Sequence, residues 1–231
     1  MIQLKSISII GCGWLGKPLA KTLEKESRVQ CFDREKTSDN SSFWQNDTII
    51  IAINTKDNYL KTLQKIAKLS STSSNIILLS SISVYREFNS ILDENVDITQ
   101  KNLQKEAEEL MQNLRKNLLI LRLGGLMGED RISGKWKKVS SFKDGPVNYI
   151  HREDVINIIK KLLKSDVKNG IFNLVAPQHP LRSLVHEQNA KNFGFMLGSF
   201  KEKTSKIINS DAIIKKLNYT FLYPNPLKFW N

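Results

Sequence analysis

The sequence predicts a Rossmann-type, doubly wound α/β fold, with a mostly parallel sheet that lacks one edge strand and a small C-terminal cap. Two observations predict this fold. Short, continuously apolar runs of strand length alternate with amphipathic helical patterns, as in parallel sheets that are covered on both faces. A glycine-rich turn joins the first apolar run to the first helical pattern. We expect residues 1–123 and 148–175 to form the sheet domain, and residues 124–147 and 176–231 to form the cap.

The glycine-rich turn reads Gly-Cys-Gly-Trp-Leu-Gly at residues 11–16, after the β-branched run Ile7–Ile10 and before a helical pattern. Gly11 permits a positive φ at a sharp turn, Gly13 leaves room for a pyrophosphate beside the main chain, and Gly16 lets the helix pack closely on the strand. The free N–H groups at the start of the helix would face the phosphates. The alternative is a glycine-rich turn without a ligand. The predicted NAD(P) contacts in this turn come from Gly11, Gly13, Trp14, Leu15 and Gly16.

A second strand is predicted at Val29–Phe32, and Asp33 and Arg34 follow it directly. In dinucleotide-binding folds an acidic residue about 20 positions after the glycines binds the ribose hydroxyls, and Asp33 fits that place. Its carboxylate would repel the extra phosphate of NADP and so favours NAD, whereas Arg34 could hold that phosphate or stack on adenine. A simple turn aspartate is the alternative. Residues 35–46 are too short and polar for a helix plus a strand, which is why we expect a missing edge strand.

The run Thr48–Asn54 is predicted to be a buried strand, and its end at Ala52, Ile53 and Asn54 would lie beside the cofactor. Ligands of such sheets bind beyond the carboxyl ends of the strands, so Leu123, at the end of a later strand, is also a predicted cofactor contact. The remaining expected elements are helices at residues 59–69, 101–117, 152–164, 184–193 and 210–217, and strands at residues 76–79, 118–123, 148–150 and 171–175.

Composition limits the class of protein. The 231 residues are 40% hydrophobic, which is enough for a core, and no apolar run of about 18 residues predicts a membrane span. The N-terminus runs straight into the first strand, so we expect no signal peptide and a cytoplasmic protein. Cys12 and Cys31 are the only cysteines and have no CxxC or histidine partner, which favours a reducing compartment and no metal site. Cys12 is expected to be a small buried side chain rather than a reactive thiol.

The formal net charge is +12, which raises the question of nucleic-acid binding. The lysines recur singly or in pairs inside amphipathic patterns, and no dense basic stripe with interleaved aromatic residues is present. We therefore expect solvated helix faces, no specific nucleic-acid partner, and some steering of an anionic small-molecule ligand.

Several stretches together resemble a known family, the extended short-chain dehydrogenases/reductases, also called the NAD-dependent epimerase/dehydratase family. The similarity is greatest to a small bacterial branch described as sugar-nucleotide epimerase-like. The stretches are Gly-Cys-Gly-Trp-Leu-Gly (11–16), Ser-Ser-Ile-Ser-Val-Tyr (80–85), Leu-Arg-Leu-Gly-Gly-Leu-Met-Gly (121–128) and Asn-Tyr-Ile-His-Arg-Glu-Asp-Val (148–155).

The resemblance implies a catalytic Ser, Tyr and Lys, with the Tyr and Lys in a YxxxK pair one helical turn apart. Ser81 matches the serine, which orients the substrate oxygen, and Lys105 matches the lysine, which also binds the nicotinamide ribose. The tyrosine position then holds Lys101. A lysine there cannot replace a phenol whose pKa is lowered by a neighbouring cation, so the proton acceptor is unassigned. Tyr85 could substitute for it, although in the family this residue is usually a packing residue.

The resemblance further implies substrate contacts from Ser83, Arg131 and His151, with Arg131 near the substrate diphosphate. A solvated loop around Arg131 and structural roles for His151 and Asp154 are the alternatives, with Asp154 capping the next helix. In relatives the helix that carries Lys105 often helps to form a homodimer. The expected function is NAD(P)-dependent oxidoreductase or epimerase-like chemistry on a sugar nucleotide or related hydroxylated metabolite. The alternative is a non-catalytic NAD(P)-binding sensor or partner protein.

Overall fold

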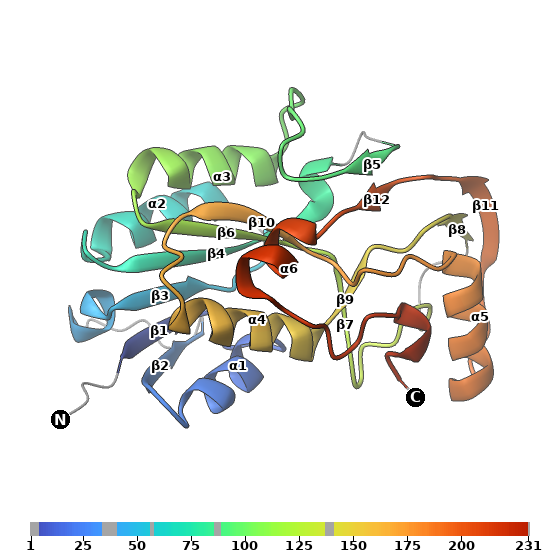
Figure 1. The fold of residues 1–231 in the computed structure, drawn as a ribbon, viewed down its shortest axis with the longest axis horizontal. Helices are drawn as coiled ribbons and strands as arrows, with labels where there is room; N and C mark the ends of the chain where they lie inside the picture. The colour runs from blue at the N-terminus through green and yellow to red at the C-terminus, as the bar shows by residue number, and fades with distance from the viewer. Residues whose placement is uncertain (1–4, 34–40, 56–57, 86–88, 137–140, 231) are drawn as a thin grey trace. The chain divides into compact units, whose positions relative to one another are not determined.

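The structure is a computed structural model that describes residues 5–33, 41–55, 58–85, 89–136 and 141–230 (Figure 1). The chain divides into two compact units. The first unit comprises Met1–Val84, Ile98–Arg122 and Leu162–Phe172, and the second comprises Tyr85–Asp97, Leu123–Lys161 and Asn173–Asn231. These bounds differ from the predicted division, and the assignment of cofactor and substrate roles to separate domains stays a prediction.

The central element is a six-stranded sheet in the order β10-β6-β4-β3-β1-β2, which confirms the Rossmann-type α/β fold. In this sheet β1 pairs in parallel with both β2 and β3, and β3 pairs in parallel with β4. The inner strands are almost entirely buried, as their continuous apolar runs predict. The strands are β1 (Ser6–Ile10), β2 (Arg28–Phe32), β3 (Thr48–Ile51), β4 (Asn75–Ser81), β6 (Leu118–Leu123) and β10 (Gly170–Leu174).

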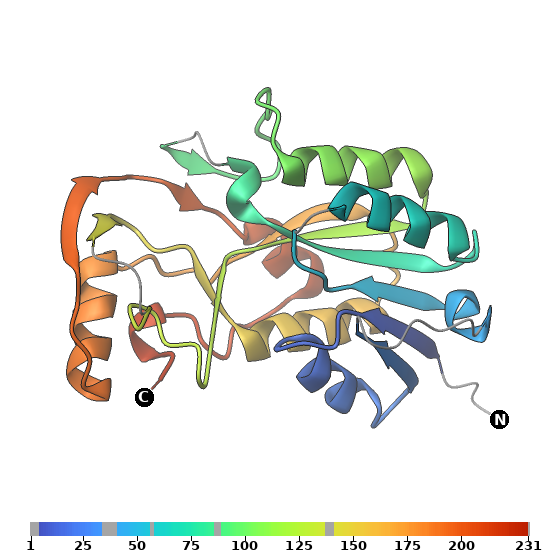
Figure 2. The ribbon, with the colours of Figure 1, turned by 180° about the vertical axis from the view of Figure 1, so that it is seen from behind.

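Helices cover the sheet of the first unit, with α2 and α3 side by side and α1 on the opposite face (Figures 1 and 2). The bounds are α1 Gly16–Leu23, α2 Tyr59–Leu69 and α3 Leu103–Leu114. One core cluster joins the buried faces of α2 and α3 to β3, β4 and β6, with Leu63, Met111 and Ile49 among its fully buried members. Each helix buries only the stripe of apolar residues that recurs at helical spacing.

In the described part of the chain β2 is the outer strand next to β1, in agreement with the predicted loss of one edge strand. The connection to β3 includes a short 3₁₀ helix, η1 (Ser41–Gln45). Its Phe43 side chain is buried against Phe32 of β2, with ring centroids 4.1 Å apart. The hydroxyl of Ser8, buried within β1, donates to the carbonyl of Phe43 over 2.6 Å. The described part of this connection therefore packs directly against β1 and β2.

The second unit contains three short ladders of two parallel strands: β5 with β12, β7 with β9, and β8 with β11. Sequence analysis predicted only β9 among these, because the other strands are two to five residues long and pair with distant segments. Beyond those given above, the elements of the described chain are β5 (Ile91–Leu92), β7 (Gly125–Met127), β8 (Ser141–Asp144), β9 (Tyr149–His151), β11 (Ser199–Lys203), β12 (Ile207–Ile208), α4 (Arg152–Lys164), α5 (Arg182–Phe193), α6 (Asp211–Leu217) and the 3₁₀ helices η2 (Ile82–Tyr85) and η3 (Pro226–Lys228).

Among the described residues, no helix combines the length and apolar character needed to cross a bilayer. In the same part of the chain no three His, Cys, Asp or Glu side chains gather into a group that could hold a metal ion.

Candidate functional site

The turn at residues 11–16 has the backbone geometry that its glycines predict. Gly11 adopts φ +107°, and a Cβ at this position would lie 2.4 Å from the carbonyl oxygen of Ala52. A Cβ on Gly16 would lie 2.1 Å from the carbonyl oxygen of Gly11. A Cβ on Gly13 would meet no atom within 4 Å. Two of the glycines are therefore required by the fold itself, whereas Gly13 leaves open space beside the main chain, where a phosphate could approach.

Hydrogen bonds fix the turn to the neighbouring strand. The amides of Gly11 and Cys12 both donate to the carbonyl of Phe32, over 2.7 and 3.1 Å. Helix α1 then begins at Gly16, and no side chain caps its N-terminus, where Leu15 holds the N-cap position. Leu15 is buried and Trp14 is half-buried. The amides of Lys17 and Leu19 already donate to the carbonyls of Gly13 and Leu15, so it is the helix dipole, positive at this end, that favours an anionic ligand here.

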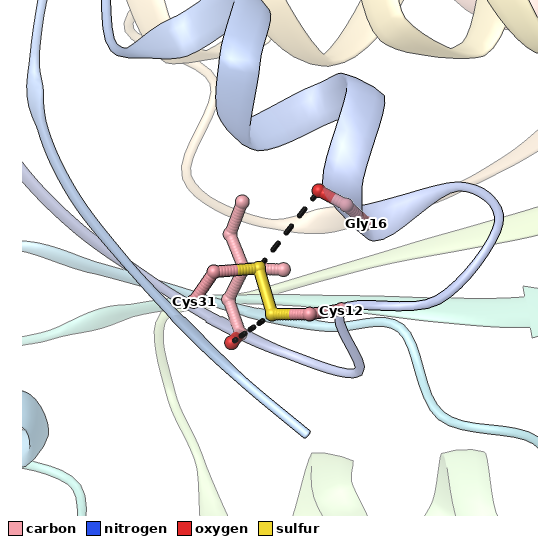
Figure 3. The surroundings of a disulfide bond; sticks show 4 residues. Cys12, Gly16 and Cys31 are labelled. Atoms are coloured by element: carbon pink, nitrogen blue, oxygen red, sulfur yellow. Dashed lines mark hydrogen bonds between the residues drawn. A yellow bond between two sulfur atoms is a disulfide. The ribbon is translucent and has the colours of Figure 1, made fainter. Parts of the chain in front are cut away.

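The two cysteines form a disulfide, which the reading of them as cysteines without a partner missed, while Cys12 is buried as expected (Figure 3). The reason is the parallel pairing of β1 with β2, which sets Ile9 opposite Cys31. The chain then leaves β1 and turns back towards Phe32, which carries Cys12 to Cys31 with the Cα atoms 5.8 Å apart. A separation of 19 residues in the sequence gives no direct sign of this contact.

Asp33 directly follows β2 and is exposed, next to the residue whose carbonyl binds the glycine turn. Arg34 lies outside the described residues. At the end of β3, Ala52 donates its amide to Ile10 over 2.8 Å, Ile53 packs against the core, and Asn54 is exposed. The structure thus brings the turn, Phe32–Asp33 and the end of β3 together at the carboxyl ends of neighbouring strands. Their roles in cofactor binding stay predictions.

Ser81 is the last residue of β4 and is half-buried. Its hydroxyl accepts the amide of Ser83 over 3.2 Å, which holds the chain in a tight turn into η2. Ser83 is half-buried as well. The preceding Ser80 points its hydroxyl at Glu108 of α3 instead, over 2.6 Å. The end of β4 is therefore tied to the helix that carries Lys105.

Lys105 lies in the first turn of α3, and its amide donates to the N-cap side chain of Asn102 over 3.0 Å. Its ammonium group lies 3.4 Å from the carboxylate of Glu109, one turn further along the helix. Lys101 is exposed and precedes the helix, which begins at Leu103 rather than at residue 101 as predicted. Positions 101 and 105 are therefore not one helical turn apart on α3, and the side chain at 101 belongs to the surface.

A buried ion pair that sequence analysis missed supports this region. Arg122, at the end of β6, donates to both carboxylate oxygens of Glu108 over 2.6 to 3.1 Å, and both residues are about 2% exposed or less. Ser80 of β4 also donates to this carboxylate, so Glu108 receives hydrogen bonds from two strands. A signal was present in the sequence: Arg122 interrupts an apolar strand, and Glu108 lies three residues before the buried Met111, on the same side of the helix. Charges this deep in a core are nearly always paired.

Three predicted site residues lie in the second unit. Leu123 ends β6 and is half-buried. Arg131 is exposed at a tight turn, where its main chain exchanges hydrogen bonds with Gly128. His151 is buried and stacks on Tyr223, with ring centroids 3.8 Å apart, and burial lowers its pKa to about 4. These contacts favour a structural role for His151, while the predicted substrate contacts of all three residues stay predictions.

Two further candidates have structural partners. Tyr85 is fully buried, and its hydroxyl donates to the carbonyl of Asp93 or to the amide oxygen of Asn173, each 3.1 Å away. This packing favours the family's usual role over that of a substitute catalyst. Asp154, in the first turn of α4, accepts the Tyr219 hydroxyl and the amides of Leu222 and Tyr223 over 2.7 to 3.0 Å. It therefore holds the 219–223 segment, in addition to any effect on its own helix.

Comparison with protein-family models finds no match. A curated relative from Escherichia coli strain K12, Protein YeeZ, is 28% identical over 269 aligned positions, which cover 97% of this chain and 98% of the relative.

Solved structures share the fold over nearly the whole chain. A Methylobacillus flagellatus protein provisionally named an NAD-dependent epimerase/dehydratase matches with TM-score 0.79 at 18% identity, covering 99% of this chain and 97% of that one. A short-chain dehydrogenase/reductase superfamily protein from Agrobacterium tumefaciens with bound NAD matches with a TM-score of 0.74 at 12% identity, covering 96% of this chain and 95% of that one. The UDP-N-acetylglucosamine 4-epimerase of Bacillus cereus matches with a TM-score of 0.71 at 16% identity, covering 97% of this chain and 96% of that one. At these identities the similarity establishes the fold.

Proposed function

We propose that this chain is an NAD(P)-dependent enzyme of the extended short-chain dehydrogenase/reductase type. Its proposed substrate is a sugar nucleotide or a related hydroxylated, anionic metabolite. The observation that carries the proposal is the glycine turn, in which Gly11 and Gly16 are packed against main-chain oxygens while Gly13 stays open. The names of the structural neighbours support the same cofactor class and the same substrate class.

The chain's own residues fit a dinucleotide at this place. The turn would hold the diphosphate with main-chain N–H groups at the uncapped start of α1. The exposed carboxylate of Asp33 would accept hydrogen bonds from the adenosine ribose, which favours NAD over NADP. Ala52, Ile53 and Asn54 would line the adjoining strand end. When held by these residues, a nicotinamide dinucleotide would supply hydride-transfer chemistry at the substrate carbon.

Ser81 and Lys105 would position the reacting hydroxyl. Ser81 can donate a hydrogen bond to the substrate oxygen while its own oxygen keeps the amide of Ser83. Lys105 is held on the first turn of α3 by the Asn102 cap, with its cation available to the nicotinamide ribose once it leaves Glu109. The group that takes the hydroxyl proton is not assigned, because Lys101 stands where the family has its tyrosine.

A titration of NAD and NADP against the wild type, Asp33→Ala and Gly13→Ala tests this proposal. We expect the wild type to prefer NAD. Asp33→Ala should weaken NAD binding about tenfold and remove the preference, since each lost charge-assisted hydrogen bond is worth about 1.5 kcal/mol or more. Gly13→Ala should weaken both cofactors and leave the fold intact. Equal and weak binding of both cofactors by all three proteins would overturn the assignment.

The second candidate function is a non-catalytic NAD(P)-binding sensor or partner protein. The observation in its favour is the exposed Lys101 outside α3, where a phenol would be needed for proton transfer. Incubation with NAD and a panel of sugar nucleotides separates the two functions. NADH formation, or exchange of a labelled substrate hydrogen, that is lost in Ser81→Ala supports the enzyme. Tight cofactor binding without turnover on the whole panel supports the sensor.

A homodimer is part of the proposal. The exposed faces of α2 and α3 form a shallow groove that combines apolar and charged side chains, among them Leu60, Lys61, Glu106 and Leu110. Such a mixed surface suits a symmetric contact between two copies. Light scattering across a range of concentrations would show a mass of about twice 26.5 kDa if the dimer forms.

A further inference from the structure

The disulfide joins the two segments that carry most of the predicted cofactor contacts. Cys12 lies inside the glycine turn, between Gly11 and Gly13, and Cys31 lies in β2 two residues before Asp33. The phosphate-binding turn and the ribose-binding carboxylate are therefore connected by one covalent bond. No family role of the glycine turn calls for a cysteine at this position, because its amides and its open space do the binding.

The two sulfur atoms also lie close to main-chain atoms of neighbouring elements (Figure 3). The sulfur of Cys12 lies 3.9 Å from the carbonyl oxygen of Ile9 in β1, and that of Cys31 lies 3.9 Å from the carbonyl oxygen of Gly16 at the start of α1. The disulfide thus packs between the end of β1, the start of α1 and β2. Its reduction would leave the hydrogen bonds from Gly11 and Cys12 to Phe32 in place. The turn would remain but would gain conformational freedom at the position where its main-chain N–H groups must stay aligned.

From this placement we propose that Cys12 and Cys31 form a reversible redox modification site that controls dinucleotide affinity. The disulfide form binds the dinucleotide more tightly than the dithiol form, because the crosslink orders the turn before binding and so reduces the conformational entropy lost on binding. This inference rests on the proposed function. Its reaction partners are dithiols, small or protein-borne, in one direction and disulfides in the other.

Reduction of this disulfide is a thiol–disulfide exchange in two steps. A thiolate of the incoming dithiol attacks the sulfur of Cys31, which belongs to the less buried residue, and the bond to Cys12 breaks. Cys12 leaves as a thiolate in the turn before α1, where main-chain N–H groups and the positive end of the helix dipole favour an anion. The second thiol of the reagent then displaces Cys31. Two electrons pass to the protein, each cysteine takes up one proton, and the reagent becomes a disulfide.

The test uses the full chain in air-oxidised form and after reduction with dithiothreitol. Thiol titration should count no reactive thiol in the first and two in the second, because the chain has two cysteines. NAD affinity, measured by calorimetry, should fall about tenfold on reduction, within the usual range of coupling between two sites. The matched control is the double variant Cys12→Ser/Cys31→Ser, which should bind like the reduced wild type and show no response to dithiothreitol.

Coupling must also run in the opposite direction. Saturating NAD should make the disulfide harder to reduce by the same tenfold factor, which shifts the midpoint of a redox titration by about 30 mV. Equal NAD affinity of the oxidised and reduced wild type would overturn this inference and leave the proposed function standing. Two titratable thiols in the air-oxidised protein would overturn it as well. An absence of NAD and NADP binding in both redox forms would overturn the proposed function and this inference together.

Discussion

Two regions divide the expected chemistry. Cofactor binding is expected at the glycine turn, residues 11–16, and proton transfer at residues 101–105, which lead into α3. In the turn, each glycine has the geometry that its role requires. Lys105 lies in the first turn of α3, whereas position 101 is an exposed lysine that precedes the helix. Main-chain binding depends on backbone shape, whereas proton transfer depends on one side chain, so the second can change while the first is kept.

The largest effect is expected from Glu108→Ala, which would leave Arg122 buried without its carboxylate. Breaking one partner of a buried ion pair costs about 3–5 kcal/mol, so urea unfolding should show a free energy of unfolding lower by about 4 kcal/mol. The control is Glu109→Ala, whose carboxylate is about half exposed and should cost less than about 1 kcal/mol. Equal losses in the two variants would show that the pair does not anchor the start of α3.

Gly16→Ala tests whether the turn is set by its backbone contacts. The new methyl group would meet the carbonyl oxygen of Gly11, so we expect a loss of about 3 kcal/mol in the free energy of unfolding. Gly13→Ala meets no neighbouring atom and should change this free energy by less than about 0.5 kcal/mol. Thermal unfolding of both variants beside the wild type gives the answer, and a similar loss in each would contradict the described geometry.

Ser81→Ala addresses the chemical half of the comparison. We expect turnover to fall about 100-fold, equivalent to about 2.7 kcal/mol of transition-state stabilisation, with NAD affinity within about twofold of the wild type. Ser80→Ala is the neighbouring control, because its hydroxyl serves Glu108 and not the substrate. It should lower stability by about 1 kcal/mol and leave turnover nearly unchanged. The reverse pattern would assign the serine role to position 80.

A pH series separates stability from cofactor binding. Burial lowers the pKa of His151 and His186 to about 4 each, so below about pH 6.5 the unfolded chain takes up protons that the folded chain does not. Stability is then lost as the pH falls from about 6.5 to 4, and at pH 5 each histidine accounts for about 2 kcal/mol. Urea unfolding at pH 7 and 5 measures this loss, which should be smaller in His186→Gln. NAD affinity at the same two pH values should stay level, since neither histidine belongs to the glycine turn.

The smallest effect is expected from Lys101→Tyr, which places a phenol at the exposed position where the family that the sequence resembles has one. We expect a gain in turnover of up to about tenfold, below the usual 10²–10⁴ range for general acid–base groups, because residue 101 lies outside α3. Lys101→Phe lacks the hydroxyl and should show no gain. A gain in both variants would point to the loss of a positive charge as its cause.

Much of the fold could be predicted from the sequence, because buried strands and amphipathic helices leave continuous local patterns. Helix α2 has the predicted bounds, and β6 was placed to the residue. The short ladders such as β5 with β12 were missed, since two-residue strands have no pattern of their own. The glycine turn was recognisable because its requirements are local.

What could not be predicted depends on contacts between distant segments. The disulfide joins residues 19 positions apart through the pairing of β1 with β2, and the partner of Arg122 lies on α3, 14 residues earlier. The start of α3 was placed two residues early because Asn102 caps the helix, and the polar residues 101–105 carry no periodic signal at their boundary.

The bidentate contact between Glu108 and Arg122 has a consequence for how this protein can change over time. The Glu108 carboxylate accepts hydrogen bonds from Ser80 of β4 and Arg122 of β6, and these bonds fix the rotation of α3 about its own axis. Turning the helix by one residue would break all of them. Substitutions on the solvent face of α3 can then accumulate without moving Lys105. The residue at position 101, and with it the group that accepts the proton, can therefore change and change back while the position of α3 stays the same.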